Sequence, residues 1–308
     1  MRYIKKYWAR HNQNGIFHKG VTLMKILETF DGSLLANEEK FQDQFFERFK
    51  LKKRKIRLTA DIEKEYNFPT FYGDVTCCQA IFLCSYDAAR ALMPHSAVRP
   101  VRALKKHAVM AVSCYEYKNV MGIPPYNEIA FTIAVDVEKE KSPILLPLMR
   151  NSYSGYFVFS MPVTSRENCI RGNVIWGLPK VTQEIDIEAA GGEALVKAFE
   201  DGTEYFRLRI PKKGKMTPMD ETSYLFPKLN DVVHRAQTNF KGDFFIAKNL
   251  GVLLNPGKIP AEPFLTIGDT PCGRTLKDLQ LSPLPLQTRF VEHMTACFDY
   301  YDETYELK

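Results

Sequence analysis

The sequence predicts a mainly β protein of the α+β class, in which strands form a curved or closed barrel-like body and helices are few and short. Aromatic residues make up 12% of the 308 residues, with 21 Phe and 15 Tyr, and they occur with Val and Ile in short alternating runs that favour strands. Long strand–helix alternation is missing from the sequence, which argues against a doubly wound parallel sheet. We therefore expect a mixed or antiparallel barrel-like sheet.

Turn signals separate the expected strands. Gly191-Gly192 and Asp201-Gly202 divide three of them into an antiparallel meander. Ser85 is the expected cap of a short helix that stops before Pro94. The expected strands cover residues 76–84, 107–117, 128–137, 153–161, 181–187, 193–199, 204–210, 232–238, 243–247, 264–268 and 288–298.

A second helix is predicted just after the middle of the chain. The four residues 164–167, Thr-Ser-Arg-Glu, match the capping box that opens many helices. We expect this helix to run to about Ile175, and Gly177 and Pro179 to end it.

Residues 1–69 form an expected N-terminal extension with two features. The first is an amphipathic helix over residues 37–49, capped by Asn37, which places four phenylalanines on one face: Phe41, Phe45, Phe46 and Phe49. This face packs on the protein's own body or forms an interface between subunits, and the first is favoured. The second is a basic run at residues 48–57, interpreted as a solvated edge rather than a nucleic-acid surface, because nothing downstream resembles a nucleic-acid module.

Composition limits the classes of function. The net charge of +6 is compatible with a small anionic substrate without requiring one. The basic N-terminus lacks a following apolar segment, and no run approaches the roughly 18 apolar residues of a membrane span, so we expect a cytoplasmic protein without membrane contact. The seven cysteines suit reduced thiols, and the six histidines lie too far apart for a short-spaced zinc motif.

One lysine stands in unusually apolar surroundings. Lys180 follows the expected helix end and the turn Gly177-Leu178-Pro179, with Ile175, Trp176 and Val181 nearby. An ordinary lysine amine, with a pKa of about 10.4, is neutral in only roughly one molecule in 2,500 at pH 7, and removal of water lowers that pKa. Two interpretations stay open on these residues alone: a desolvated nucleophile, or a turn lysine that points at solvent.

Three segments together resemble the acetoacetate decarboxylase family. Residues 171–181, with Gly-Leu-Pro-Lys, resemble the region that carries the family's Schiff-base lysine. Tyr126-Asn127-Glu128 is similar to the segment that ends in its active-site glutamate. Residues 262–268 and 284–286 resemble its closing strand, small turn and Leu-Pro passage. The likeness covers residues 70–300 in the family's order, which predicts a catalytic domain over that range and a tail at 301–308.

The resemblance implies a function and a site. Lys180 would form an imine with acetoacetate or a similar β-keto acid, its amine activated by desolvation or a nearby cation as is known for acetoacetate decarboxylase. Glu128 would orient the substrate or transfer a proton, although a surface carboxylate at a strand end is an equal alternative. Tyr126, Trp176 and Arg171 would contact the substrate. The family resemblance implies a homo-oligomer that uses no cofactor and no metal. The expected partner is the small keto-acid substrate, and no nucleic acid is expected to bind.

Two departures from the family's pattern keep other functions open. Val181 stands where the characterised decarboxylase has a second lysine, and the family's arginine has no clear counterpart, so that Arg150, Arg166 and Arg171 are the candidates to replace it. Divergent relatives in the family keep the lysine but use a pyruvate imine for aldol condensation and dehydration, in place of decarboxylating acetoacetate. The alternatives are therefore an aldolase-dehydratase, or a carboxylate-binding member of the fold without turnover.

Overall fold

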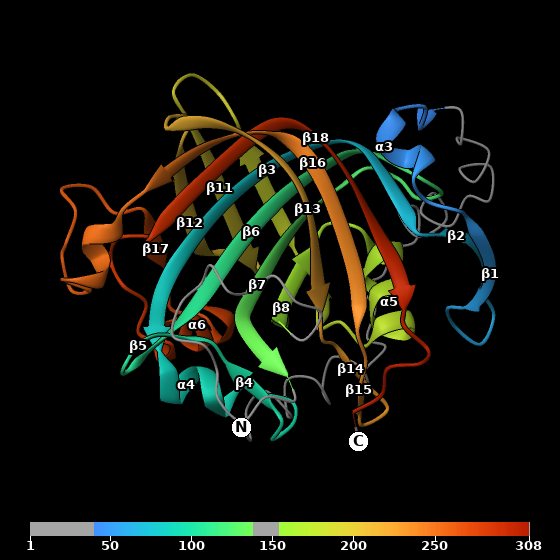
Figure 1. Ribbon diagram of the computed structural model, residues 1–308, viewed down its shortest axis with the longest axis horizontal. Helices are drawn as coiled ribbons and strands as arrows, with labels where there is room; N and C mark the ends of the chain where they lie inside the picture. The colour runs from blue at the N-terminus through green and yellow to red at the C-terminus, as the bar shows by residue number, and fades with distance from the viewer. Residues whose placement is uncertain (1–39, 138–153, 308) are drawn as a thin grey trace.

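The computed structural model describes residues 40–137 and 154–307, and a closed β-barrel is its main body (Figure 1). Neighbouring strands pair in the order β7-β6-β3-β18-β16-β13-β8, and pairing of β8 with β7 closes the ring. Adjacent strands are antiparallel except β13 and β8, which touch at Leu225 and Tyr156 in parallel. The strands are β3 (Thr70–Ser85), β6 (His107–Val120), β7 (Tyr126–Val137), β8 (Ser154–Val163), β13 (Lys215–Leu225), β16 (Ala236–Lys248) and β18 (Gln287–Tyr301). The predicted barrel-like, mainly β fold is confirmed.

Smaller strands extend this ring at its edges. β4 (Val98–Pro100) pairs with β7, β5 (Arg102–Leu104) with β6, and β9 (Lys180–Thr182) runs parallel to β8. A short hairpin, β14 (Lys228–Leu229) and β15 (Val232–Val233), precedes β16. The strand expected at 232–238 is therefore divided by a break, and the one expected at 243–247 is the later part of β16.

A second sheet covers part of the outer face of the barrel. It contains β10 (Glu184–Glu188), β11 (Glu193–Glu200), β12 (Thr203–Pro211) and β17 (Leu265–Ile267), paired in that order. Alternate residues of β11 are buried, as expected for a sheet with one covered face. Phe131 of β7 packs edge-on against Phe206 of β12, with ring centroids 5.3 Å apart. The predicted meander of three antiparallel strands is confirmed by the β10–β11 and β11–β12 registers.

The helices of the described residues are short. They are α3 (Gln44–Glu47), α4 (Tyr86–Ala91), α5 (Arg166–Trp176), α6 (Pro271–Asp278) and the 3₁₀ turn η4 (Leu250–Leu253). Ser85 caps α4 by accepting a hydrogen bond from the Ala88 N–H, as predicted. Gly177 ends α5 in the left-handed region at φ 68°, where a side chain would be strained and would collide with the Lys228 carbonyl.

The predicted capping box at the start of α5 is wrong in its details. Ser165, not Thr164, is the N-cap, and its hydroxyl accepts from the Asn168 N–H at 3.1 Å. Glu167 is fully buried and turns away from the cap, because it pairs with Lys64 and Tyr66 instead. Buried partners decide where this carboxylate points.

The helix predicted over residues 37–49 is also shorter than expected. Asn37 lies outside the described residues, and α3 is a single turn capped by Asp43. The described phenylalanines nevertheless pack inward, and Phe46 lies 4.5 Å from Phe71 of β3 between ring centroids. This face is therefore covered by the chain's own body.

The basic run forms a strand whose backbone pairs with a neighbouring strand and whose side chains form ion pairs. β1 (Lys52–Arg57) hydrogen-bonds to β2 (Glu63–Phe68), neither of which was predicted. Glutamates balance much of its charge through the pairs Lys53–Glu65, Lys55–Glu63 and Arg54–Glu303.

In the part that the structure describes, helices are all too short or too polar to cross a bilayer. All seven cysteines are free thiols, and five of them are buried.

Candidate active site

Lys180 is held at the start of β9 by the end of α5. Its backbone N–H donates to Asn173 Oδ1 at 3.0 Å, and its side chain lies across the helix at Gly172. A Cβ on Gly172 would come within 2.5 Å of Lys180 Cδ, so only glycine leaves room for this path. The lysine is 6% exposed, which places its amine away from bulk water.

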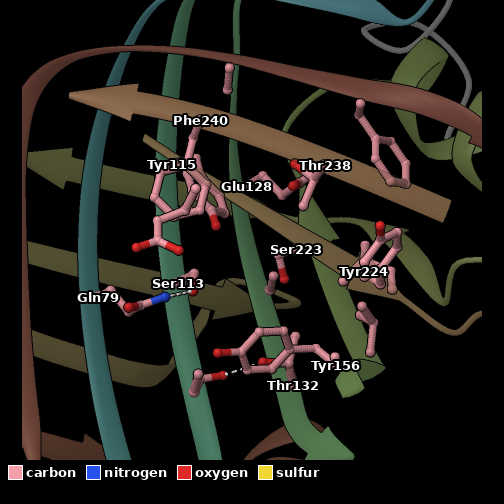
Figure 2. A pocket seen from close by; sticks show the side chains of 18 of the residues that line it. Gln79, Ser113, Tyr115, Glu128, Thr132, Tyr156, Ser223, Tyr224, Thr238 and Phe240 are labelled. Atoms are coloured by element: carbon pink, nitrogen blue, oxygen red, sulfur yellow. Dashed lines mark hydrogen bonds between the residues drawn. The ribbon is translucent and has the colours of Figure 1, made fainter. Parts of the chain in front are cut away.

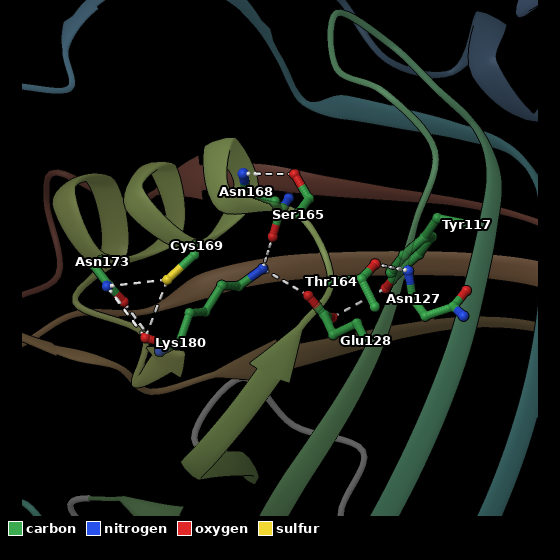
Figure 3. Close-up of polar contacts among 9 residues, drawn as sticks. All are labelled: Tyr117, Asn127, Glu128, Thr164, Ser165, Asn168, Cys169, Asn173 and Lys180. Atoms are coloured by element: carbon green, nitrogen blue, oxygen red, sulfur yellow. Dashed lines mark hydrogen bonds and ion pairs between the residues drawn. The ribbon is translucent and has the colours of Figure 1, made fainter. Parts of the chain in front are cut away.

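The amine is held by two side chains from different elements (Figure 3). Lys180 Nζ lies 2.6 Å from Glu128 Oε2, and it also donates to Asn168 Oδ1. Glu128 comes from β7 and Asn168 from the first turns of α5. The second carboxylate oxygen, Glu128 Oε1, accepts from the Tyr117 hydroxyl at 3.3 Å. The carboxylate is therefore oriented by a lysine on one side and a tyrosine on the other.

Burial makes the amine more acidic than an ordinary lysine. Loss of water lowers the pKa of Lys180, and the positive charge of Arg171 lowers it further, while the charge of Glu128 acts in the opposite direction. The pKa is lowered overall, so the neutral amine needed for attack on a carbonyl is more accessible at neutral pH. Burial also raises the pKa values of Tyr117 and Tyr126, with the charge of Glu128 adding to this, so both hydroxyls remain proton donors.

A second buried ionic cluster lies behind α5. Arg171 is 1% exposed, donates to the Thr70 hydroxyl, and places its guanidinium 4.7 Å from the centre of the Tyr66 ring. Glu167 Oε1 accepts from Lys64 Nζ at 2.7 Å and from the Tyr66 hydroxyl at 2.6 Å. This cluster, here called the α5 anchor (Lys64, Tyr66, Thr70, Glu167 and Arg171), holds the helix that supports Lys180. Arg171 of this cluster supplies a positive charge that lowers the pKa of Lys180. Val181, which stands where the characterised decarboxylase has a second lysine, supplies none.

The amine faces a cavity of about 690 Å³ inside the barrel (Figure 2). Lys180, Glu128 and Leu178 form part of its wall. Inward side chains of the barrel strands supply the rest, and several of them are polar: Gln79, Ser113, Thr132, Tyr156, Glu221, Ser223, Thr238 and Arg289. A cavity of this size, with one buried amine and a few polar groups, is typical of a small-molecule site.

The structure brings some of the predicted residues together and separates others. Lys180 and Glu128 touch and both line the cavity, and the ring centre of Tyr126 lies 5.8 Å from Lys180 Nζ. Arg171 sits in the α5 anchor, behind the described cavity wall. Trp176 also packs behind that wall, where its indole N–H donates to the Asp299 carbonyl at 3.0 Å.

Of the other two arginines considered, Arg166 begins α5 and is partly buried, whereas Arg150 lies outside the described residues. Three contributors were not predicted: Asn168, Gly172 and Tyr117. Asn168 and Gly172 are four residues apart and so share a helix face, which is a signal the sequence carries once Lys180 is placed against α5.

Metal ligation has no support at this site or elsewhere among residues 40–137 and 154–307, where no three His, Cys, Asp or Glu side chains gather to hold an ion.

A protein-family model described as acetoacetate decarboxylase (ADC) matches residues 58–241. The chain belongs to the acetoacetate decarboxylase family. Comparison with curated protein sequences finds no match.

Solved structures of this family share the fold of the chain. Acetoacetate decarboxylase from Legionella pneumophila is 11% identical with a TM-score of 0.53, over 77% of this chain and 88% of that one. An acetoacetate decarboxylase-like enzyme from Sphingomonas wittichii RW1 is 14% identical with a TM-score of 0.50, over 82% and 94%. At these identities the likeness shows the fold alone. The activity has to be argued from the site of this chain.

Proposed function

We propose that this family member is a Schiff-base-forming lyase that decarboxylates acetoacetate or a similar β-keto acid through an imine on Lys180. The observation that carries the proposal is the position of the Lys180 amine: it is buried, it faces the barrel cavity, and it touches Glu128 at 2.6 Å. A desolvated amine beside a carboxylate that accepts its proton has the properties of a carbonyl nucleophile.

The reaction follows from these groups. The ammonium of Lys180 passes a proton to Glu128, and the neutral amine attacks the ketone carbon to form a carbinolamine. Loss of water gives an iminium ion. The bond between the α-carbon and the carboxylate then breaks, CO₂ leaves, and the electron pair moves into the iminium nitrogen to give an enamine. Protonation at carbon and hydrolysis release the ketone and the free lysine.

The neighbouring side chains have separate roles in this scheme. Glu128 accepts and returns the proton, because it touches the amine directly. Asn168 and Gly172 are positioning residues that fix the direction of the amine, and Tyr117 orients Glu128 through its hydrogen bond of 3.3 Å. Such fixed geometry is worth a large part of the rate in reactions of this kind.

The test is reduction of the imine. With acetoacetate and borohydride, wild-type protein is expected to gain the mass of a reduced adduct on the peptide that contains Lys180, and Lys180→Ala is expected to gain none. Lys258, an exposed lysine, supplies the control variant Lys258→Ala, which should label like wild type. An unlabelled wild-type protein, under conditions that label a known imine-forming enzyme, would remove the proposal.

The size of the cavity supports a second candidate, aldol condensation and dehydration through a pyruvate imine. Acetoacetate occupies only a small part of about 690 Å³, so a second reactant also fits. Release of CO₂ from acetoacetate separates the two reactions: decarboxylation yields one CO₂ for each acetoacetate consumed, whereas an aldolase-dehydratase labels with pyruvate and releases none.

A further inference from the structure

The cavity carries a second group of polar side chains away from Lys180. Gln79 of β3 and Ser113 of β6 face each other across the sheet and are joined by a hydrogen bond of 2.7 Å from Gln79 Nε2 (Figure 2). Arg289 of β18 pairs with Gln79 on the other side, so the three lie in one row across β18, β3 and β6. We call them the distal row.

The distal row has unused hydrogen-bonding capacity. Gln79 Oε1 and Arg289 Nε are both shielded from water and have no partner among the described residues. The one hydrogen bond found there for the Arg289 side chain is a long one, 3.5 Å from Nη2 to Gln287 Oε1, and the described part of the chain supplies no ion pair to it. A partly buried guanidinium and an amide oxygen left unpaired in a cavity wall favour a bound partner, because unmet polar groups are costly.

The charge of the missing partner follows from the surroundings. Arg289 is a cation in the wall, and its fork of N–H donors matches a carboxylate. Three acidic residues line the same cavity, but Glu128 already pairs with Lys180 at 2.6 Å and Asp220 with Arg48 at 3.0 Å, which leaves Glu221. Glu221 lies opposite Phe240 on β16, whereas Arg289 lies opposite Ile246. Those positions on β16 are six residues apart, about 20 Å along a strand, so Glu221 lies too far from Arg289 to be its partner.

The distance from Lys180 sets the length of the ligand. Glu128, which touches the amine, lies in a row of paired residues next to the distal row. That row crosses β7, β6, β3 and β18 through Glu128, Tyr115, Cys77 and Val291. Arg289 is therefore three strands across from Glu128, about 14 Å, and one inward row along, about 7 Å, before the side chains reach inward. The carboxylate of a β-keto acid lies only about 2.5 Å from its ketone carbon. A group that meets Arg289 must be separate from the one that leaves as CO₂.

We propose that the distal row binds a second carboxylate, at the far end of an extended keto diacid whose ketone reacts with Lys180. This inference rests on the proposed function for its reactive end, and on Arg289, Gln79 and Ser113 for its other end. The substrate class is then a linear keto acid with a terminal carboxylate several carbons from the ketone.

The experiment compares keto acids that differ only at the far end. The probes are acetoacetate, 3-oxoadipate, its homologue longer by two methylene groups, and the methyl esters of both diacids at the distal carboxylate. The measured quantity is the concentration that half-saturates borohydride labelling of Lys180. For wild type we expect at least one diacid to label at about tenfold lower concentration than its own ester, the effect of one charge-assisted hydrogen-bonded pair.

Variants decide whether the distal row is responsible. Arg289→Gln should bring the ratio of diacid to ester close to one, and Arg289→Lys should restore part of the preference. Arg274→Gln, a change at an exposed arginine on α6, is the matched control and should keep the wild-type ratio. Melting curves exclude unfolded variants from the comparison.

The outcomes separate this inference from the proposed function. If Lys180 labels but diacids and esters half-saturate alike in wild type, or if Arg289→Gln keeps the preference, the distal carboxylate site is refuted and the imine stands. If none of the probes labels Lys180, the proposed function fails, and the inference fails with it.

Discussion

Replacing Gly172 with alanine is expected to slow the reaction at Lys180 by about a hundredfold or more without unfolding the protein. The added methyl group would meet Lys180 Cδ at 2.5 Å and Cε at 2.7 Å. These atoms belong to a flexible side chain, so the lysine moves and the backbone stays. Its amine then leaves Glu128 and Asn168, and a displacement of about 1 Å in such a site can cost about a hundredfold in rate.

The stability of this variant should stay close to that of the wild type. Alanine within a helix is favoured over glycine by up to about 1 kcal/mol, which offsets part of the free energy of unfolding lost when Lys180 leaves Glu128 and Asn168. Kinetics of ketone formation and thermal melting together check the prediction. Val174→Ala, at an exposed position of the same helix, is the control and should change neither. A Gly172→Ala enzyme with wild-type rate would show that the path of Lys180 across α5 is unimportant.

The second large effect is expected in the α5 anchor, where Glu167→Gln should lower the free energy of unfolding by about 3 kcal/mol or more. The change removes the negative charge that Lys64 contacts at 2.7 Å, and both side chains are almost wholly buried. A buried ammonium without its anion cannot recover its hydration, which is why breaking one side of a buried pair costs about 3–5 kcal/mol.

An exposed ion pair provides the comparison for this loss. Glu204→Gln removes the partner of Arg207 at 2.8 Å on the surface, and we expect a change within about 0.5 kcal/mol. Chemical denaturation of both variants measures the difference. Equal losses in the two would mean that the anchor contributes no more than a surface pair. Replacing Lys64 and Glu167 together by apolar residues should recover much of the stability.

The sequence predicted the barrel where strands are apolar and failed where they are not. β3, β6, β7 and β18 read as strands because their alternating or continuous apolar runs have one physical explanation, burial on one or both faces. β13 was missed because its residues alternate between half-exposed and exposed positions, with Thr, Asp, Glu and Ser among them. The pattern of a strand that faces a polar cavity on one side and solvent on the other resembles that of a loop.

The sequence likewise predicted only part of the candidate active site. The apolar turn around Lys180 was visible in the sequence, and Glu128 entered through the family resemblance. Their contact, and the contribution of Asn168, depend on how β7, β9 and α5 meet in space. Glu167 was read as a capping residue because only its local neighbours are visible in sequence, whereas its partners, Lys64 and Tyr66, are about a hundred residues away. Long-range pairs of this kind decide the electrostatics and carry no local signal.

The pKa of Lys180 is the most direct measure of whether its amine is prepared for attack on a carbonyl. Competitive acetylation with acetic anhydride across a pH series, followed by mass spectrometry of each lysine peptide, reports it against the exposed Lys258 in the same sample. Because burial lowers the pKa of Lys180, its reactivity should rise to a plateau at a lower pH than that of the exposed reference lysine. Coincident titration curves for the two lysines would contradict the account.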